Sequence, residues 1–121
     1  MNIAIIGASN DRSKYGNKAV RAYSMMGHTV FPVNPKEKEI EGLTCYKSVT
    51  AIPYKIDRVS LYVPPEVGIT LVNQIKRVSP KEVYINPGAE SDELLEAFRK
   101  AGIKPLLVCA INAIGVDPTN L

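Results

Sequence analysis

Residues 5–16, IIGASNDRSKYG, contain the groups best suited to holding a phosphate. Gly7 and Ala8 follow an apolar run and leave room for another group to approach the backbone closely. Ser9 adds a hydroxyl group, and Lys14 adds a positive charge. Backbone N–H groups in such a loop, and at the start of a helix behind it, donate to phosphate oxygens with help from the helix dipole. The segment therefore indicates an anion site.

The spacing of this loop departs from the common dinucleotide-binding fingerprint. That fingerprint is G-x-G-x-x-G, whereas Gly7 is followed here by Ala8, Ser9 and a wider excursion to Gly16. A single glycine after a strand also fits an ordinary strand-to-helix turn. Taken alone, the loop is compatible with either a phosphate site or a structural turn.

A second candidate site follows the apolar run at 29–33. NAD-binding domains usually carry an acidic residue there, which hydrogen-bonds the ribose 2′-hydroxyl. This chain instead has Lys36 and Lys38. Two lysines would suit a ribose that bears its own phosphate, as in NADP or coenzyme A (CoA), because a carboxylate would repel that charge. The alternative is a solvated loop in which the lysines are neutralised by nearby acidic residues, namely Glu37, Glu39 and Glu41.

The elements that would position these loops alternate along the chain. Short apolar runs rich in β-formers alternate with stretches of helical periodicity, which is typical of a parallel sheet covered by helices. We expect strands at 2–6, 29–33, 43–46, 57–63, 82–86 and 104–109. We expect helices at 17–26, briefly at 48–52, after Pro64 and Pro65 up to about Val78, and from Ser91 as N-cap to Ala101.

Right-handed crossovers between parallel strands favour an open doubly wound sheet. We therefore predict a single-domain, Rossmann-like α/β fold over residues 1–121, with a mainly parallel sheet of strand order 3-2-1-4-5-6 and 43–46 as strand three. In such sheets, ligands lie beyond the carboxyl ends of the strands where the strand order reverses. The loop that begins at Gly7 lies at this point, between strand 2–6 and strand 57–63.

Composition excludes several functional classes. A chain of 121 residues with net charge +3 and mixed acidic and basic residues does not resemble a nucleic-acid-binding module. It has no apolar stretch long enough to cross a bilayer, and its N-terminus enters a strand pattern without a charged leader, so we expect a cytoplasmic protein. Cys45, Cys109 and His28 do not have metal-ligand spacing, so we expect no metal site.

Four segments, taken together, resemble one known family. AIIGAS with KYG downstream, VFPVNP, LYVPP and INPGAES occur in the order and at the intervals seen in small stand-alone CoA-binding proteins. The fold of that family is similar to the N-terminal domain of the succinyl-CoA synthetase alpha subunit. The resemblance covers nearly the whole chain. It implies a Rossmann-like domain that binds CoA across the switch point of the sheet.

The resemblance also implies roles for individual residues. The diphosphate would be held by Gly7, Ala8, Ser9 and Lys14. The adenine and ribose would lie against Val33, Asn34 and Pro35, with either Lys36 or Lys38 reaching the 3′-phosphate. The opposite wall and the pantetheine side would be formed by Val63, Pro64, Ile85, Asn86 and Pro87.

The chain departs from the larger ligases of this kind. Those enzymes add a second domain with a phosphorylated histidine, whereas His28 follows a helix stop and reads as part of an exposed turn. The serines have no histidine partner for nucleophilic catalysis, so we expect no catalytic residue. Cys109 ends a strand at the edge where the cleft is expected. Its thiol either exchanges with that of CoA in a mixed disulfide or is a buried, inert side chain.

We therefore expect a protein that binds CoA or an acyl-CoA and has no catalysis of its own. One alternative is an NADP-binding oxidoreductase fragment or redox sensor. Another is an interaction subunit that serves an enzyme encoded elsewhere. Neither nucleic acid nor membrane is an expected partner, and a homodimer or a partner enzyme subunit is compatible with the sequence.

Overall fold

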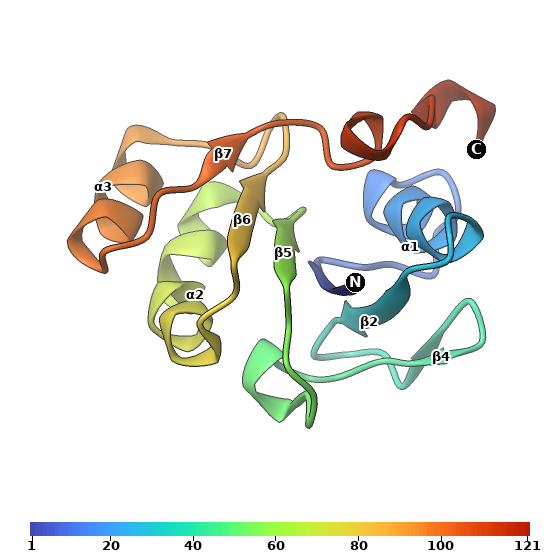
Figure 1. Cartoon of the computed structure of the whole chain (residues 1–121), viewed down its shortest axis with the longest axis horizontal. Helices are drawn as coiled ribbons and strands as arrows, with labels where there is room; N and C mark the ends of the chain where they lie inside the picture. The colour runs from blue at the N-terminus through green and yellow to red at the C-terminus, as the bar shows by residue number, and fades with distance from the viewer.

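The computed structural model describes residues 1–121 and contains a five-stranded parallel sheet of order β2-β1-β5-β6-β7 (Figure 1). Its strands are β1 (Asn2–Ile6), β2 (Thr29–Val33), β5 (Arg58–Leu61), β6 (Glu82–Ile85) and β7 (Leu106–Leu107). Ala4 of β1 is paired with Phe31 on one side and Val59 on the other. The parallel, doubly wound, Rossmann-like architecture is confirmed.

Helices and irregular segments cover both faces of the sheet. On one side lie α2 (Pro65–Val78), α3 (Asp92–Lys100) and the 3₁₀ turn η1 (Val49–Ala51), and on the other lie α1 (Tyr15–Met25) and the C-terminal segment (Figure 1). Each face has its own core, one around Leu61 and Phe98 and the other around Ile5 and Tyr23. This double burial explains why the strands are apolar almost throughout.

The helices begin and end largely where local chemistry predicts. Ser91 caps α3, its hydroxyl accepting from the N–H of Leu94 at 3.0 Å. Pro65 occupies the first position of α2, where the missing N–H costs nothing. The first helix starts at Tyr15, two residues earlier than predicted, which brings its N-terminus closer to the loop after β1.

The expected third strand differs most from the prediction. Residues Leu43–Thr44 form β4, which pairs antiparallel with β3 (Glu39–Ile40) in a small separate hairpin. Only Tyr46 reaches the main sheet, in an isolated parallel bridge to Val33. Pro32 turns its carbonyl toward Tyr46 but has no N–H to donate, so this edge of β2 cannot extend a full ladder.

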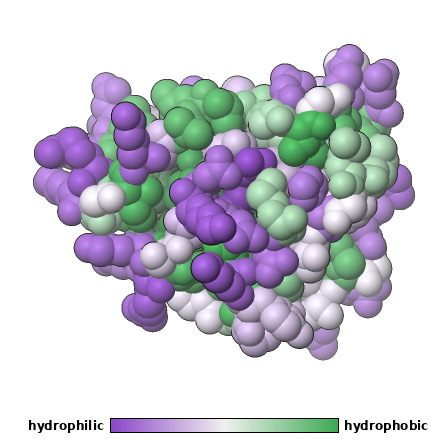
Figure 2. All heavy atoms as spheres, in the orientation of Figure 1, coloured by the Kyte–Doolittle hydropathy of each residue, from purple (hydrophilic) through white to green (hydrophobic).

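Two other strands are shorter than expected. The prediction for 57–63 corresponds to the four residues of β5, and that for 104–109 to the two residues of β7. Both residues of β7 are exposed, and Figure 2 shows a hydrophobic patch over this strand. Apart from the absent third strand, the strands of the main sheet follow the predicted order. None of the helices has the length and apolar character needed to cross a bilayer.

Candidate ligand-binding cleft

A cleft of about 740 Å³ lies at the carboxyl ends of the strands, beside the point where β1 and β5 are neighbours. Nine of the predicted site residues line it: Gly7, Ala8, Ser9, Lys14, Asn34, Val63, Pro64, Asn86 and Pro87. Eight further residues complete the lining: Tyr15, Gly16, Tyr62, Gly88, Ala89, Cys109, Asn112 and Pro118. The loops after four strands, β1, β2, β5 and β6, and the C-terminal segment therefore converge on one space.

Two glycines allow the loop after β1 and the start of α1 to pack together. Gly7 has φ +90°, and a Cβ added there would lie 2.8 Å from the carbonyl oxygen of Tyr62. A Cβ added at Gly16 would lie 2.2 Å from the carbonyl oxygen of Gly7. The sequence pattern marks Gly16 as the end of the loop but does not predict a role in the site. The absence of a side chain at Gly16 allows the start of α1 to contact the loop directly.

A buried amide side chain holds the same loop from below. Asn17 is fully buried, and its Nδ2 donates to the carbonyl oxygen of Ser9 at 2.8 Å. Arg21 Nε donates in turn to Asn17 Oδ1 at 2.7 Å. A polar residue on the buried face of a helix was the available sequence signal for this role, and it was missed.

The N-terminus of α1 presents positive potential to the cleft. Its N-cap residue, Lys14, makes no side-chain capping bond, and the first turn contains no acidic residue. The partial positive charge of the helix end and the lysine ammonium therefore act together. An anion at this place would be stabilised by both.

Asn34 joins the loop after β2 to the loop after β1. Its Nδ2 donates to the carbonyl oxygen of Ala8 at 2.9 Å, and its Oδ1 accepts from the N–H of Lys36 at 2.9 Å. The backbone adds a bond from the Gly7 N–H to the Val33 carbonyl at 3.1 Å. Asn34 thus lines the cleft and also fixes the shape of its rim.

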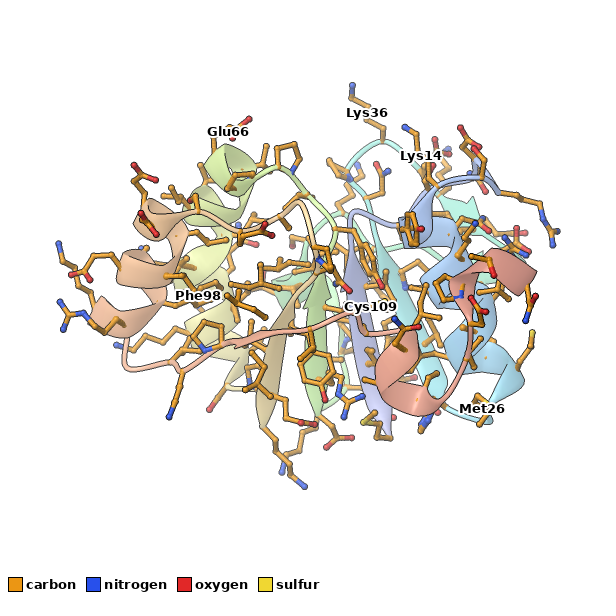
Figure 3. All side chains as sticks on the ribbon, turned by 90° about the horizontal axis from the view of Figure 1, so that it is seen from above. Lys14, Met26, Lys36, Glu66, Phe98 and Cys109 are labelled. Atoms are coloured by element: carbon orange, nitrogen blue, oxygen red, sulfur yellow. The ribbon has the colours of Figure 1, made fainter.

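Five predicted site residues do not line the cleft. Val33 and Ile85 are buried in the core beneath it, and Pro35, Lys36 and Lys38 are exposed beside it. Figure 3 shows the Lys36 side chain extending from the same end of the molecule as that of Lys14, at the opposite end from Met26. Lys36 therefore lies at the same end of the molecule as the cleft-lining Lys14.

Two of the three acidic residues near these lysines have other partners. Glu37 accepts from Asn10 Nδ2 at 2.8 Å, and Glu41 pairs with Arg12 at 3.3 Å. None of the four ion pairs of the chain includes Lys36 or Lys38. Neither lysine is therefore paired directly with a carboxylate.

The far side of the cleft depends on Asn86, which is 3% exposed. Its Nδ2 donates to Ser60 Oγ at 2.7 Å and to the Leu61 carbonyl oxygen at 2.9 Å. Its Oδ1 accepts from the Ala110 N–H at 2.8 Å. The side chain therefore ties β5, β6 and the C-terminal segment together.

Tyr62 and Cys109 supply the polar groups of this inner end. The Tyr62 hydroxyl is buried without a hydrogen-bond partner, and burial raises the pKa of its phenol well above the ordinary value of 10.0. Cys109 is half-buried and unpaired (Figure 3). His28 lies outside the residues of the cleft, with its Nδ1 3.2 Å from the N-terminal amine of Met1.

Known proteins with similar sequences include CoA-dependent ligases. The acetate–CoA ligase (ADP-forming) II subunit alpha of Pyrococcus furiosus is 33% identical over 98% of this chain. The chain spans 28% of the length of that relative, so the match concerns one part of a larger protein.

Solved structures with a similar fold include proteins of the same size and larger synthetases. A conserved hypothetical protein from Pyrococcus furiosus is similar with a TM-score of 0.81 and 39% identity, over 87% of this chain and 90% of that one. The dinucleotide-forming acetyl-coenzyme A synthetase 1 of Ca. Korarchaeum cryptofilum is similar with a TM-score of 0.73 and 27% identity, over 89% of this chain and 25% of that one. The sequence model of the CoA binding domain matches residues 1–114, and the chain belongs to that family.

Proposed function

We propose that this protein binds CoA, free or acylated, in the cleft at the carboxyl ends of its strands. The observation that carries the proposal is the meeting, in one cleft, of an uncapped helix N-terminus, Lys14 and the Gly7 loop. Membership of the CoA binding domain family supports the identity of the ligand. An anionic nucleotide would be stabilised by these groups without any catalytic side chain.

The ligand would lie with its phosphates toward α1 and its thiol toward Cys109. Lys14 would meet the diphosphate, and Lys36 or Lys38 would meet the ribose phosphate. Asn86, Pro87 and Cys109 form the inner end, where a pantetheine chain would pass. The cleft volume of about 740 Å³ falls in the range of small-molecule and cofactor sites.

The biological role that follows is that of a binding module. The similar ligase subunit is several times longer than this chain, so its catalytic activity is not carried over with the match. We propose that the protein acts as a CoA carrier or sensor, or presents CoA to a separate catalytic subunit in the cytoplasm. It would use no metal and no catalytic residue of its own.

Thermal unfolding with four ligands tests the proposal. A ligand that binds only the folded state at 100 times its Kd stabilises that state by about 2.7 kcal/mol. CoA should raise the Tm most, followed by dephospho-CoA, with NADP and NAD producing smaller shifts. A larger shift with NADP would favour the oxidoreductase or redox-sensor alternative, and no shift with any ligand would contradict nucleotide binding.

The two exposed lysines are distinguished by a second ligand pair. Lys36→Ala and Lys38→Ala should each be titrated with CoA and with dephospho-CoA. The lysine that meets the ribose phosphate should lose about fivefold in affinity for CoA, close to 1 kcal/mol, while its affinity for dephospho-CoA stays the same. Unchanged CoA affinity in both variants would remove the proposed role of this loop.

A further inference from the structure

The C-terminal segment forms part of the cleft although it has little regular structure. Cys109, Asn112 and Pro118 line the cleft, while the neighbouring strand β7 has only two residues and η2 covers Asn112–Ile114. A segment of this kind has few backbone ladder bonds to hold it. Side chains from elsewhere in the fold must therefore set its position.

The backbone of one residue in this segment, Ala110, is held on both sides of its Cα. The Ala110 N–H donates to Asn86 Oδ1 at 2.8 Å, and the Ala110 carbonyl accepts from the Tyr23 hydroxyl at 2.7 Å. Tyr23 is fully buried and Asn86 is 3% exposed. Both bonds are therefore shielded from competing water, and both partners come from elements that are themselves fixed in the core.

The Tyr23 hydroxyl is in turn held by a charged side chain. Arg58 Nη1 donates to it at 3.1 Å, while Arg58 pairs with Glu82 at 2.9 Å and lies over the ring of Tyr84 at 4.2 Å. Burial raises the pKa of the Tyr23 phenol, although Arg58 opposes this shift. The phenol therefore keeps its proton at neutral pH and remains a donor to Ala110.

We propose that Tyr23 and Asn86, through the backbone N–H and C=O of Ala110, position the C-terminal wall of the cleft and thereby set the affinity for the thiol end of the ligand. Tyr23 is a positioning residue that does not itself line the cleft. The inference rests on CoA as the proposed ligand. Without the tyrosine hydroxyl, the buried carbonyl of Ala110 lacks a donor, and the residues on either side of it shift to satisfy that group.

The variant Tyr23→Phe removes the hydroxyl and keeps the ring. Its affinity should be measured for CoA and for adenosine 3′,5′-bisphosphate, which has the nucleotide half but no pantetheine chain. The dissociation constant for CoA should rise about tenfold, equivalent to about 1.4 kcal/mol, and that for the bisphosphate should stay within twofold of the wild-type value. A general loss of stability would not separate the two ligands.

Thiol modification of Cys109 gives a readout that needs no ligand. In a Cys45→Ala background, Tyr23→Phe should raise the modification rate of Cys109 at least threefold under conditions where the protein is fully folded. Tyr54→Phe is the matched control because Tyr54 is exposed and its hydroxyl makes no hydrogen bond within the chain. The control should match wild type in both measurements.

The outcomes separate this inference from the proposed function. If wild-type protein binds neither ligand, CoA binding fails, and the modification rate still decides the positioning role. Equal effects of Tyr23→Phe on CoA and bisphosphate, or unchanged Cys109 reactivity, would overturn the positioning role while leaving CoA binding intact. If Tyr23→Phe does not fold, Arg58→Lys is the second variant, because it removes the hydrogen bond from the guanidinium to the Tyr23 hydroxyl. It should give smaller changes of the same kind in CoA affinity and in the Cys109 modification rate.

Discussion

The two walls of the cleft are held in place by different means. The wall formed by the loop after β1 depends on close backbone packing, with Gly7 and Gly16 leaving no space for a side chain. The wall formed by β6 and the C-terminal segment depends on buried side-chain hydrogen bonds, centred on Asn86 and the backbone of Ala110. Glycine-based packing leaves the first wall built largely of backbone, whereas the opposite wall is lined by uncharged side chains such as Asn86, Pro87 and Cys109.

This difference matches the two ends of the proposed ligand. A phosphate needs N–H donors and positive charge, which the loop, the start of α1 and Lys14 provide. A pantetheine chain carries no charge and ends in a thiol, and Cys109 with the buried Tyr62 hydroxyl lies at that end. Changes in the two walls should therefore have separable effects on binding.

The largest effect is expected at the glycine contact. Gly16→Ala would place a Cβ 2.2 Å from the Gly7 carbonyl oxygen, which forces the helix and loop apart. Overpacking of this kind should lower the free energy of unfolding by about 3 kcal/mol. It should also abolish CoA binding, because it displaces the loop proposed to hold the diphosphate. Chemical denaturation and calorimetric titration measure the two quantities.

Gly68→Ala is the matched control for that change. Gly68 also lies in a helix, but a Cβ there would meet Leu94 at 3.4 Å, an ordinary contact. Its stability should stay within about 1 kcal/mol of wild type, because alanine also gains helix propensity. Similar losses in both variants would show that close packing at Gly16 is not special.

Asn86→Ala tests the opposite wall. It removes the acceptor for the buried Ala110 N–H and three hydrogen bonds in all. The free energy of unfolding should fall by about 2 to 3 kcal/mol, since a buried donor is left without a partner. Asn10→Ala, at an exposed asparagine with two hydrogen bonds on the loop side, should lose less than about 1 kcal/mol, and equal losses would contradict the burial argument.

Lys14→Ala should affect binding without affecting the fold. Lys14 is exposed and makes no ion pair, so the free energy of unfolding should stay unchanged. Loss of a charge-assisted contact to phosphate should weaken CoA binding about tenfold. Lys100→Ala, at the exposed end of α3, should leave the affinity unchanged, and a similar loss there would indicate a nonspecific charge effect.

Acid should loosen the outer rims of both walls before the buried network. The pKa of Asp11 is lowered below 3.8 by hydrogen bonds from Ser13, and that of Asp117 by hydrogen bonds from Thr119. Each lowered pKa contributes stability that is present above 3.8 and is lost as the pH falls through the folded-state value.

Hydrogen exchange measures this small effect directly. Between about pH 5 and about pH 2, the amides of Ser13 and Thr119 should lose protection after correction for intrinsic rates, while that of Ala110 keeps it. The Ala110 amide donates to a neutral asparagine and does not depend on a carboxylate. Earlier loss of protection at Ala110 would contradict the contrast between rim and network.

Much of the fold could be predicted from sequence because its signals are local. Apolar runs bounded by glycine and proline located the main strands, and Ser91 and Pro65 located two helix starts. The prediction of 43–46 as a third strand of the main sheet was wrong, because Pro32 lies at the outer edge of β2 and has no N–H with which to extend a ladder there. The sequence shows the proline, but only the tertiary structure shows that it lies at this edge of the sheet.

The site was predicted where loops directly follow strands and missed where contacts are long-range. Ser9, Asn34 and Pro87 lie in such loops and do line the cleft. Asn112 and Pro118 come from a tail with weak sequence signals, and the Tyr23 contact to Ala110 joins residues 87 positions apart. The ligand-binding roles of all these residues remain predictions.

A crystal structure of the protein with CoA would show directly whether the cleft holds this ligand. We expect CoA in the cleft, with its diphosphate at the N-terminus of α1 beside Lys14 and its thiol directed toward Cys109. An empty cleft at saturating CoA, or CoA bound on another face of the sheet, would contradict it.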